Sequence, residues 1–258
     1  MNPFLSQLFS LQGCVGLCTG SASGIGRRMA LALAQAGADL VLVDRDPRGL
    51  AEAESEIEKL PGGRSATLTA DLLDRSGIQN LVEKAGESFG APDILINAAG
   101  VNLREPVEEV SWESWDQTVN LNLAVPFFLA RACVAGMRAK GRGRIINIAS
   151  LQSFRAFPNS IPYGASKGGV AQLTRAMAEA WSGDGITANA IAPGFFPTRL
   201  TQPVFENPEL ASHSARMTAI GRNGELTDLD GTTVFLASAA SSYVTGQVLP
   251  LDGGYSAK

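Results

Sequence analysis

The chain has 258 residues, of which 45% are hydrophobic and 18% are charged. This composition is typical of a folded globular protein and excludes an intrinsically disordered one. The formal net charge of −4 gives no electrostatic reason to expect binding to nucleic acid or to an anionic membrane.

The first residues, MNPFLSQLFSLQG, lack the positively charged region and the long apolar region of a signal peptide. No uninterrupted apolar run approaches the length of a membrane span. Cys14, Cys18 and Cys133 have no metal-ligand spacing and cannot all pair, which is typical of a reducing compartment. The one histidine, His213, has no partner at metal-ligand spacing either. We therefore expect a cytoplasmic protein without a metal site.

Short apolar runs alternate with longer amphipathic stretches along the chain. The runs predict seven strands, at Cys14–Thr19, Leu40–Val43, Ser65–Leu68, Ile94–Asn97, Arg144–Ala149, Thr187–Ile191 and Gln247–Leu251. Helical stretches between them include Gly26–Ala36, Ile78–Phe89, Trp115–Met137 and Tyr163–Trp181. Nearly continuous apolar strands indicate burial on both faces, hence a parallel sheet. The sequence thus predicts an α/β protein with a doubly wound, seven-stranded parallel sheet flanked by helices.

The least regular stretch is 193–228, which contains four prolines and has no strong period. Its position late in an α/β chain predicts a loop-and-helix excursion over a site, acting as a lid. A surface loop without a function would have the same appearance in the sequence.

A glycine-rich turn follows the first predicted strand directly. It reads Thr19-Gly20-Ser21-Ala22-Ser23-Gly24-Ile25-Gly26 and leads into a predicted helix. In such a turn Gly20 allows the tight bend, Gly24 lets the backbone approach a pyrophosphate, and Gly26 lets the helix pack closely on the sheet. Glycine-rich turns also occur without ligands, but a strand before and a helix after favour a dinucleotide site, which we expect to include Ser23 and Ile25.

An acidic residue, Asp44, ends the second predicted strand, 18 residues after Gly26. A carboxylate at this point can accept hydrogen bonds from the adenosine ribose hydroxyls, and it repels the 2′-phosphate of NADP. Arg45 follows it and is able to pair with that phosphate, so the pattern favours NAD without excluding NADP. The weaker alternative is that Asp44 is only a turn residue at the end of a strand.

Tyr163 and Lys167 stand four residues apart, which places them on one face of a predicted helix. A free tyrosine has a pKa of about 10, too high for a base at neutral pH. A neighbouring ammonium and a cationic nicotinamide both favour the phenolate. Because a Tyr-x-x-x-Lys pair is common, it indicates chemistry only together with other features.

Two further polar residues, Ser150 and Asn122, are candidates to act together with the Tyr-x-x-x-Lys pair. Ser150 ends the fifth predicted strand, 13 residues before Tyr163. Because doubly wound sheets hold ligands at the carboxyl ends of their strands, its hydroxyl is able to bond a substrate oxygen beside the tyrosine. Asn122 lies inside a predicted helix, where asparagine is unfavourable. Its residue type alone leaves open whether it faces solvent or has a function.

In this order and spacing, the glycine-rich turn, the serine and the Tyr-x-x-x-Lys pair closely resemble the short-chain dehydrogenase/reductase family. The resemblance runs from Leu11 to the final LDGGY, and it implies a single Rossmann-fold domain over residues 1–258. Asp71 matches the family's acidic adenine-side residue, and Asn97-Ala98-Ala99-Gly100 matches its Asn-Asn-Ala-Gly motif. Alanine in place of the second asparagine weakens one local contact rather than the assignment.

The resemblance implies a catalytic tetrad of Asn122, Ser150, Tyr163 and Lys167. In it, Ser150 orients a substrate hydroxyl, and Tyr163 takes its proton while hydride passes from carbon to nicotinamide. Lys167 lowers the phenol pKa and holds the nicotinamide ribose, and Asn122 supports a water that relays the proton. Besides the turn, Asp44 and Arg45, the residues expected to bind the cofactor are Asp71, Leu72, Asn97, Ala98, Gly100, Tyr163, Lys167, Pro193, Gly194, Phe196 and Thr198.

The segment between the serine and the tyrosine is expected to line a substrate pocket. The substrate residues expected are Ser150, Gln152, Arg155, Asn159, Tyr163 and Phe195. Arg155 would be the partner of a carboxylate, although an exposed loop arginine is more often solvated or at an interface. The Ser-x-x-Ser-Phe pattern at 150–154 resembles family members that act on polyols, sugars and sugar acids, such as gluconate and galactitol dehydrogenases.

Phe195, Phe196 and Phe205 favour an apolar substrate part instead. The main alternative is therefore an NADPH-dependent 3-oxoacyl thioester reductase, although Asp44 favours NAD. A second alternative is a catalytically inactive dinucleotide-binding sensor. Loss of a catalytic residue would indicate a sensor, and none is missing.

Members of the family are usually tetramers. The apolar positions in Trp115–Met137 and Val170–Trp181 are compatible with such an interface, although the buried core of a monomer has the same pattern. We expect a homotetramer that takes a small-molecule substrate and has neither a nucleic-acid nor a membrane partner.

Overall fold

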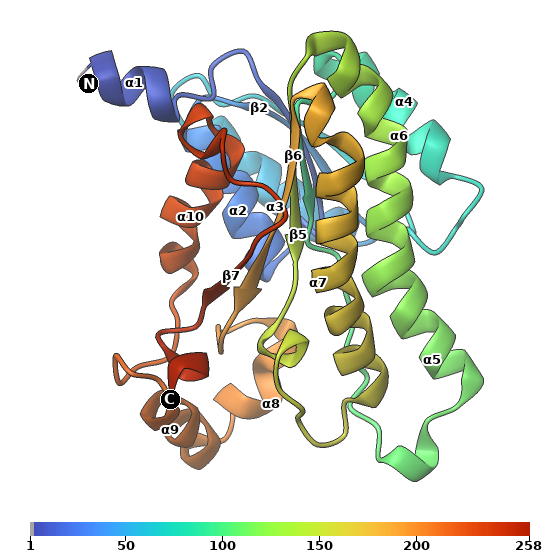
Figure 1. Cartoon of the computed structure of the whole chain (residues 1–258), viewed down its shortest axis with the longest axis vertical. Helices are drawn as coiled ribbons and strands as arrows, with labels where there is room; N and C mark the ends of the chain where they lie inside the picture. Colours follow the sequence, from blue (N-terminus) through green and yellow to red (C-terminus); the bar gives the residue numbers. More distant parts are fainter. Residues whose placement is uncertain (1–2) are drawn as a thin grey trace.

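Seven parallel strands form the centre of the structure, a computed structural model that describes residues 3–258 (Figure 1). They are β1 (Val15–Thr19), β2 (Asp39–Asp44), β3 (Ser65–Thr69), β4 (Ile94–Asn97), β5 (Gly143–Ile148), β6 (Ile186–Pro193) and β7 (Val248–Leu251). Their order across the sheet is β3-β2-β1-β4-β5-β6-β7, and neighbouring strands are parallel throughout. The seven predicted strands are thus confirmed, with ends that differ by at most two residues.

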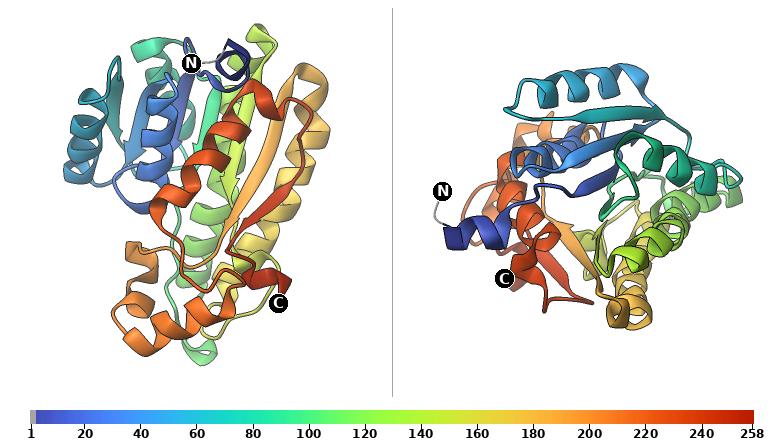
Figure 2. Two further views of the ribbon diagram at one scale, coloured as in Figure 1. Left: turned by 90° about the vertical axis from the view of Figure 1, so that its left-hand side faces the viewer. Right: turned by 90° about the horizontal axis from the view of Figure 1, so that it is seen from above.

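Helices cover both faces of the sheet, as the view from above in Figure 2 shows. One face carries α2 (Gly24–Gln35), α3 (Pro47–Glu58) and α10 (Leu229–Ala237). The other carries α4 (Ile78–Phe89), α6 (Val125–Lys140) and α7 (Ile161–Trp181). Along the chain, α1 (Pro3–Phe9) precedes β1, and α5 (Trp112–Val119) precedes α6. This arrangement is the doubly wound α/β fold that the sequence predicts.

Two hydrophobic layers hold these helices on the sheet. In β2, Leu40 and Leu42 pack into one layer and Val41 and Val43 into the other, and all four are fully buried. Successive side chains of a strand point to opposite faces, so a strand covered on both faces has to be apolar at every position. This explains why the strands were recognisable as short continuous apolar runs.

The longest predicted helix is interrupted. Instead of one helix over Trp115–Met137, α5 ends at Val119, a π-helical turn labelled η2 spans Asn120–Ala124, and α6 follows. The side-chain amide of Asn122 explains the interruption. It accepts a hydrogen bond from the backbone N–H of Val101 and donates one to the backbone carbonyl of Val101, both at 2.9 Å. Such a turn inserts an extra residue into a helix and is frequent at functional sites.

The run from Trp112 to Lys140 has 29 residues and, within residues 3–258, is the one stretch long and apolar enough to cross a membrane by length and composition. It is not an uninterrupted apolar run, because it contains Asp116, Asn122 and Arg131, so the expectation about such runs is not contradicted. In the structure these helices pack against α4 and α7. Because core helices of globular domains pass the same test, the run is accounted for by the helical layer that it forms.

The predicted excursion, residues 193–228, is largely helical rather than irregular. After β6 the chain forms the 3₁₀ turn η5 (Arg199–Thr201), α8 (Gln202–Phe205), α9 (Pro208–Met217) and the 3₁₀ turn η6 (Leu226–Asp228). The N-cap of α9 is Asn207, whose side chain accepts from the N–H groups of Glu209 and Leu210. Figure 1 shows α8 and α9 at the bottom, beyond the carboxyl ends of the strands.

Candidate active site

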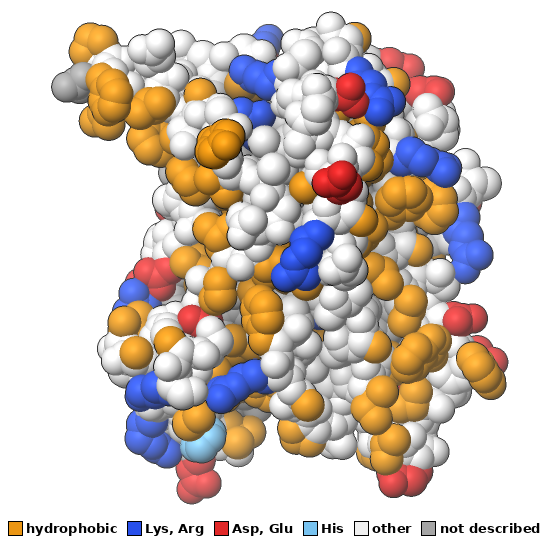
Figure 3. All heavy atoms as spheres, viewed as in Figure 1, with side chains coloured by type: hydrophobic (Ala, Val, Ile, Leu, Met, Phe, Trp, Pro, Cys, Tyr) orange, Lys and Arg blue, Asp and Glu red, His pale blue; other side chains and the backbone are white. Residues whose placement is uncertain are grey.

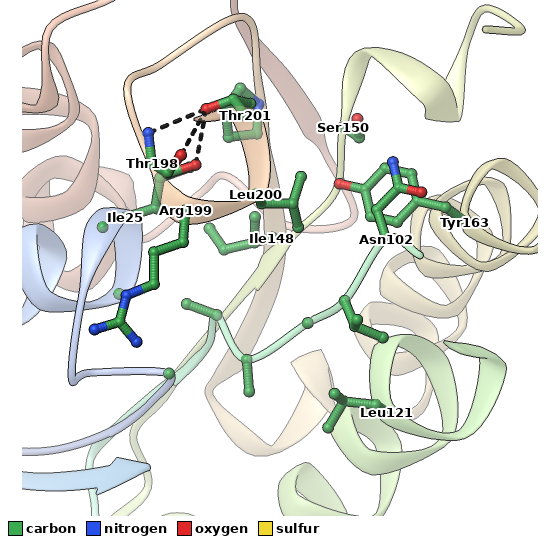
Figure 4. Close-up of a pocket in the computed structure, with 18 of the residues that line it drawn as sticks. Ile25, Asn102, Leu121, Ile148, Ser150, Tyr163, Thr198, Arg199, Leu200 and Thr201 are labelled. Carbon is green, nitrogen blue, oxygen red and sulfur yellow. Dashed lines mark hydrogen bonds between the residues drawn. The ribbon is translucent and has the colours of Figure 1, made fainter. Parts of the chain in front are cut away.

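A cavity of about 520 Å³ opens at the carboxyl ends of the strands (Figure 4). Its walls come from the segments that follow β1 to β5 and from the excursion. The chain leaves β1 toward β2 on one side, whereas β4 lies on the other side. The cavity therefore lies at the topological switch point, where doubly wound sheets bind their ligands.

The glycine-rich turn forms the part of the cavity that fits the phosphates of a dinucleotide. Gly20 and Gly24 have φ angles of 70° and 58°, which favour glycine, and a Cβ on Gly26 would lie 2.3 Å from the carbonyl oxygen of Gly20. The N-cap of α2, Ser23, makes no side-chain hydrogen bond to the helix. The first N–H groups of α2 thus have no side-chain cap and remain available to an anion in the cavity.

At the end of β2, the carboxylate of Asp44 accepts hydrogen bonds from the N–H groups of Ala22 and Asp46, both at 3.1 Å. It therefore ties the glycine-rich turn to the segment that follows β2. Asp44, Arg45 and Asp71 line the same end of the molecule's cavity. This end has the acidic and basic groups that an adenosine ribose, with or without a 2′-phosphate, would contact.

Tyr163 and Lys167 project from the first turns of α7 into the other part of the cavity. Both are buried, and the Nζ of Lys167 donates a 2.6 Å hydrogen bond to the carbonyl oxygen of Ile148. Burial lowers the pKa of Lys167 to about 8. Burial also raises the pKa of the Tyr163 phenol, which a hydrogen bond with Ser150 and the charge of Arg104 partly counter. The cation acting on the phenol in this geometry is Arg104 rather than Lys167, whose Nζ lies 5.7 Å from the tyrosine ring centroid.

Comparison with known proteins shows the family. A family model described as enoyl-(acyl carrier protein) reductase matches residues 20–256. The gluconate 5-dehydrogenase of Gluconobacter oxydans (strain 621H) is 40% identical over 247 residues, 96% of this chain and 96% of that one. The 2-dehydro-3-deoxy-D-gluconate 5-dehydrogenase of Dickeya dadantii (strain 3937) is 42% identical over 253 residues, 97% of this chain and 98% of that one.

The chain belongs to the short-chain dehydrogenase/reductase family. As such it is an oxidoreductase that acts on CH–OH groups with a nicotinamide dinucleotide. A solved gluconate 5-dehydrogenase from Burkholderia cenocepacia J2315, in complex with NADP and tartrate, has the same fold, with a TM-score of 0.92 and 36% identity over 98% of this chain and 99% of that one.

Most of the residues expected at a short-chain dehydrogenase cofactor site line the cavity. They are Gly20, Ser23, Gly24, Ile25, Gly26, Asp44, Arg45, Asp71, Leu72, Ala98, Gly100, Tyr163, Lys167, Pro193, Gly194, Phe196 and Thr198. Asn97 is the exception. Its side chain lies inside the sheet layer and donates to the side chain of Asn147 at 2.9 Å and to the carbonyl of Pro126 at 3.3 Å. The side chain of Asn97 thus lies behind the cavity wall, and a cofactor contact by this residue would have to come from its backbone.

Asn122 also lies behind the wall rather than in it. Besides its two bonds to Val101, its amide donates to the hydroxyl of Ser166 at 3.1 Å. A Cβ on Gly100 would lie 3.0 Å from its Oδ1. The side chain is therefore fully used in joining η2, α7 and the segment after β4, so any catalytic role of Asn122 passes through its backbone or through the position of those elements.

Two of the predicted substrate residues do not reach the cavity. Arg155 directs its guanidinium away, toward the carbonyls of Tyr255 at 3.5 Å and Lys258 at 3.3 Å, and stacks over the Tyr255 ring. Asn159 has a φ of 54° in the turn before α7 and does not line the cavity. The interpretation of Arg155 as a carboxylate partner is therefore corrected, whereas Ser150, Gln152, Tyr163 and Phe195 do line the cavity.

The sequence interpretation missed Arg104, which lines the cavity from the loop after β4. Its φ is 57°, and its Nη2 donates to the carbonyl of Leu200 in the excursion at 3.1 Å. Its Nε is buried and has no hydrogen-bond partner among the described residues. A basic residue just past the end of a strand was the one available signal, because the left-handed conformation that turns it inward does not show in the sequence. Within residues 3–258, no group of His, Cys, Asp and Glu side chains is placed to hold a metal ion.

Proposed function

We propose that this enzyme interconverts a secondary alcohol and a ketone on a sugar acid, with NAD as its preferred dinucleotide. The observation that carries the substrate class is the buried, unpartnered Nε of Arg104 in the same cavity as Ser150 and Tyr163. A buried donor without a partner is costly, and a substrate carboxylate would remove that cost by accepting from the guanidinium.

The electrostatic effect of Arg104 on Tyr163 supports a carboxylate site close to the reacting hydroxyl. It is near enough to Tyr163 to lower the pKa of the phenol. A carboxylate bound to Arg104 would therefore lie within one small molecule's length of the reacting hydroxyl. Polyhydroxy acids have this arrangement, with a carboxylate and a secondary alcohol a few carbons apart. Relatives of the enzyme are named for gluconate and for 2-dehydro-3-deoxy-D-gluconate.

In the proposed reaction, the hydroxyl of Ser150 holds the substrate alcohol and Tyr163 takes its proton. The nicotinamide of a bound dinucleotide supplies the hydride acceptor. Lys167 keeps a positive charge at neutral pH, because its pKa is about 8, and would hold the nicotinamide ribose, whereas the charge of Arg104 favours the phenolate.

A 3-oxoacyl thioester reductase is the alternative that the aromatic wall favours. Phe157 and Phe195 line the cavity, with ring centroids 6.1 Å apart, and Tyr255 packs behind them. An acyl chain needs no cation beside the reacting carbonyl, however, and Arg104 would keep an unpaired Nε. We therefore rank the sugar acid first. A sensor without activity ranks lowest, because Ser150, Tyr163 and Lys167 are all present and line the cavity.

The preference for NAD rests on the carboxylate of Asp44 at the end of β2, which lines the cavity and would repel a 2′-phosphate. The solved relative from B. cenocepacia contains NADP. We therefore propose a preference rather than a strict requirement for NAD, with Arg45 among the residues that make NADP acceptable.

We also propose a cytoplasmic homotetramer. Trp112, Phe128 and Ile161 on α5, α6 and α7 are exposed large hydrophobic residues. Figure 3 shows hydrophobic side chains over these long helices, which are the surfaces expected to meet another subunit. The three cysteines are free and buried, in keeping with a reducing compartment.

Replacing Arg104 with methionine tests the substrate class. Methionine keeps an unbranched apolar stem and removes the charge, so KM for D-gluconate is expected to rise roughly 10- to 100-fold, the effect of a lost charge-assisted hydrogen bond. KM for D-glucitol, the same carbon chain without the carboxylate, should change by less than about threefold. Arg155→Met is the matched control, because its guanidinium points elsewhere. Equal losses on both substrates would remove Arg104 as the carboxylate partner.

A further inference from the structure

A second arginine of the excursion, Arg199, reaches across the mouth of the cavity. It follows Thr198, whose Cγ2 would lie 3.2 Å from a Cβ on Gly24, so η5 begins directly over the glycine-rich turn. Figure 4 shows the Arg199 side chain extending from Thr198 toward the blue ribbon of the N-terminal part of the chain. There its Nη1 lies 3.3 Å from Oδ2 of Asp46. Arg199 lines the cavity along its course.

This ion pair lies at the end of the cavity that receives the adenosine ribose. The backbone N–H of Asp46 donates to Oδ1 of Asp44, so the guanidinium of Arg199 lies next to the carboxylate that distinguishes the two dinucleotides. Arg45, between these two acids, also lines the cavity. Two arginines from distant parts of the chain therefore line the cavity together with Asp44, where a 2′-phosphate would sit.

The partner of Arg199 does not depend on it. The other carboxylate oxygen of Asp46 accepts from the N–H groups of Arg48 and Gly49, both at 3.2 Å, and so caps α3. The side chain of Arg199 is 73% exposed, and an ion pair this exposed contributes little to stability. Arg199 is thus free to exchange Asp46 for another anion, while Asp46 keeps its place as the helix cap.

We propose that Arg199 binds the 2′-phosphate of NADP, so that the excursion itself contributes to cofactor selectivity. This inference rests on the proposed dinucleotide-dependent function. The charge of Asp44 is already engaged by two backbone N–H groups, which reduces its repulsion of a phosphate. A guanidinium presents paired donors that match phosphate oxygens. Arg199 would here exchange the carboxylate of Asp46 for the more highly charged 2′-phosphate.

The same contact links the cofactor to the substrate side. Leu200, the next residue, accepts a hydrogen bond from Nη2 of Arg104 at 3.1 Å. A phosphate that fixes Arg199 therefore also fixes the backbone that holds Arg104. Binding of NADP should consequently order the carboxylate-binding arginine more firmly than binding of NAD does.

Equilibrium binding of NAD and NADP to the full chain, measured by titration calorimetry, tests the proposal without any turnover. Arg199→Ala is expected to weaken NADP binding about tenfold or more and NAD binding by less than about twofold. Asp46→Asn keeps a cap for α3 but removes the competing charge, so it is expected to tighten NADP binding. Arg216→Ala, an exposed arginine of α9, is the control and should change neither affinity.

Three other results would contradict the assignment of Arg199 to the 2′-phosphate. Equal weakening of NAD and NADP in Arg199→Ala would place the arginine on the pyrophosphate and overturn the assignment. Unchanged binding of both would leave the pair with Asp46 as a surface contact and overturn it as well. If the unsubstituted protein bound neither dinucleotide, the proposed function itself would fail together with the inference.

Discussion

Replacement of Tyr163 by phenylalanine is expected to lower kcat by roughly 10²- to 10⁴-fold, the usual contribution of a positioned general base. Phenylalanine keeps the ring that fills the buried position at the start of α7, and removes only the hydroxyl that contacts Ser150. Binding of the dinucleotide should change by less than about twofold, because the loss affects proton transfer rather than the glycine-rich turn. Steady-state rates and a binding titration on the same preparation separate the two effects.

Tyr255→Phe is the matched control for this substitution. Tyr255 is also buried and lies in the aromatic cluster behind the cavity, but it does not line the cavity. Its replacement should leave kcat within about threefold of the original value. Near-normal turnover by Tyr163→Phe would remove Tyr163 as the base, whatever the control shows.

Replacement of Lys167 by methionine is expected to abolish turnover and at the same time to stabilise the ligand-free protein. Burial lowers the pKa of Lys167 from 10.5 to about 8, so the folded state holds this proton less firmly than the unfolded state does. At 1.36 kcal/mol per pKa unit, the charge costs about 3 kcal/mol of folding free energy at neutral pH. Methionine removes that cost and fills the same buried space.

The sign of the pH dependence distinguishes this effect from better packing. Between pH 8 and 10.5 the unfolded state binds more protons than the folded state, so the free energy of unfolding of the original protein should rise with pH across this window. The Lys167→Met variant should lack that rise and lose its advantage by pH 10.5. Urea unfolding at several pH values measures both. Lys84→Met, on the exposed side of α4, is the control. A constant difference across the window would refute the charge argument.

Much of the fold, and the positions of Tyr163 and Lys167 in the cavity, could be predicted because they depend on local patterns. Buried strands require continuous apolar residues, and the glycine-rich turn requires glycine at Gly20 and Gly24 by backbone conformation. Tyr163 and Lys167 follow from their spacing on one helix face. Each of these signals lies within a few residues of the feature that it predicts.

The rest of the site depends on contacts between distant segments. The π turn exists because Asn122 bonds Val101, 21 residues away, and no periodicity shows such a contact. Arg155 lies five residues after Ser150 in the sequence, which favours a carboxylate partner, yet the C-terminal segment around Tyr255 turns its side chain away from the cavity. Arg104 faces the cavity because of a left-handed backbone angle that its residue type disfavours. The sequence shows that these side chains are present, but it does not show which way they point.

The most direct test of the account is the initial rate of reduced dinucleotide formation on matched substrates: D-gluconate, D-glucitol and a 3-hydroxyacyl thioester, each with NAD and with NADP. We predict oxidation of D-gluconate or a related sugar acid that depends on Tyr163, with much lower kcat/KM on D-glucitol and none on the thioester. Activity confined to the thioester, or equal activity on the acid and the neutral polyol, would contradict the role of this cavity as a sugar-acid site.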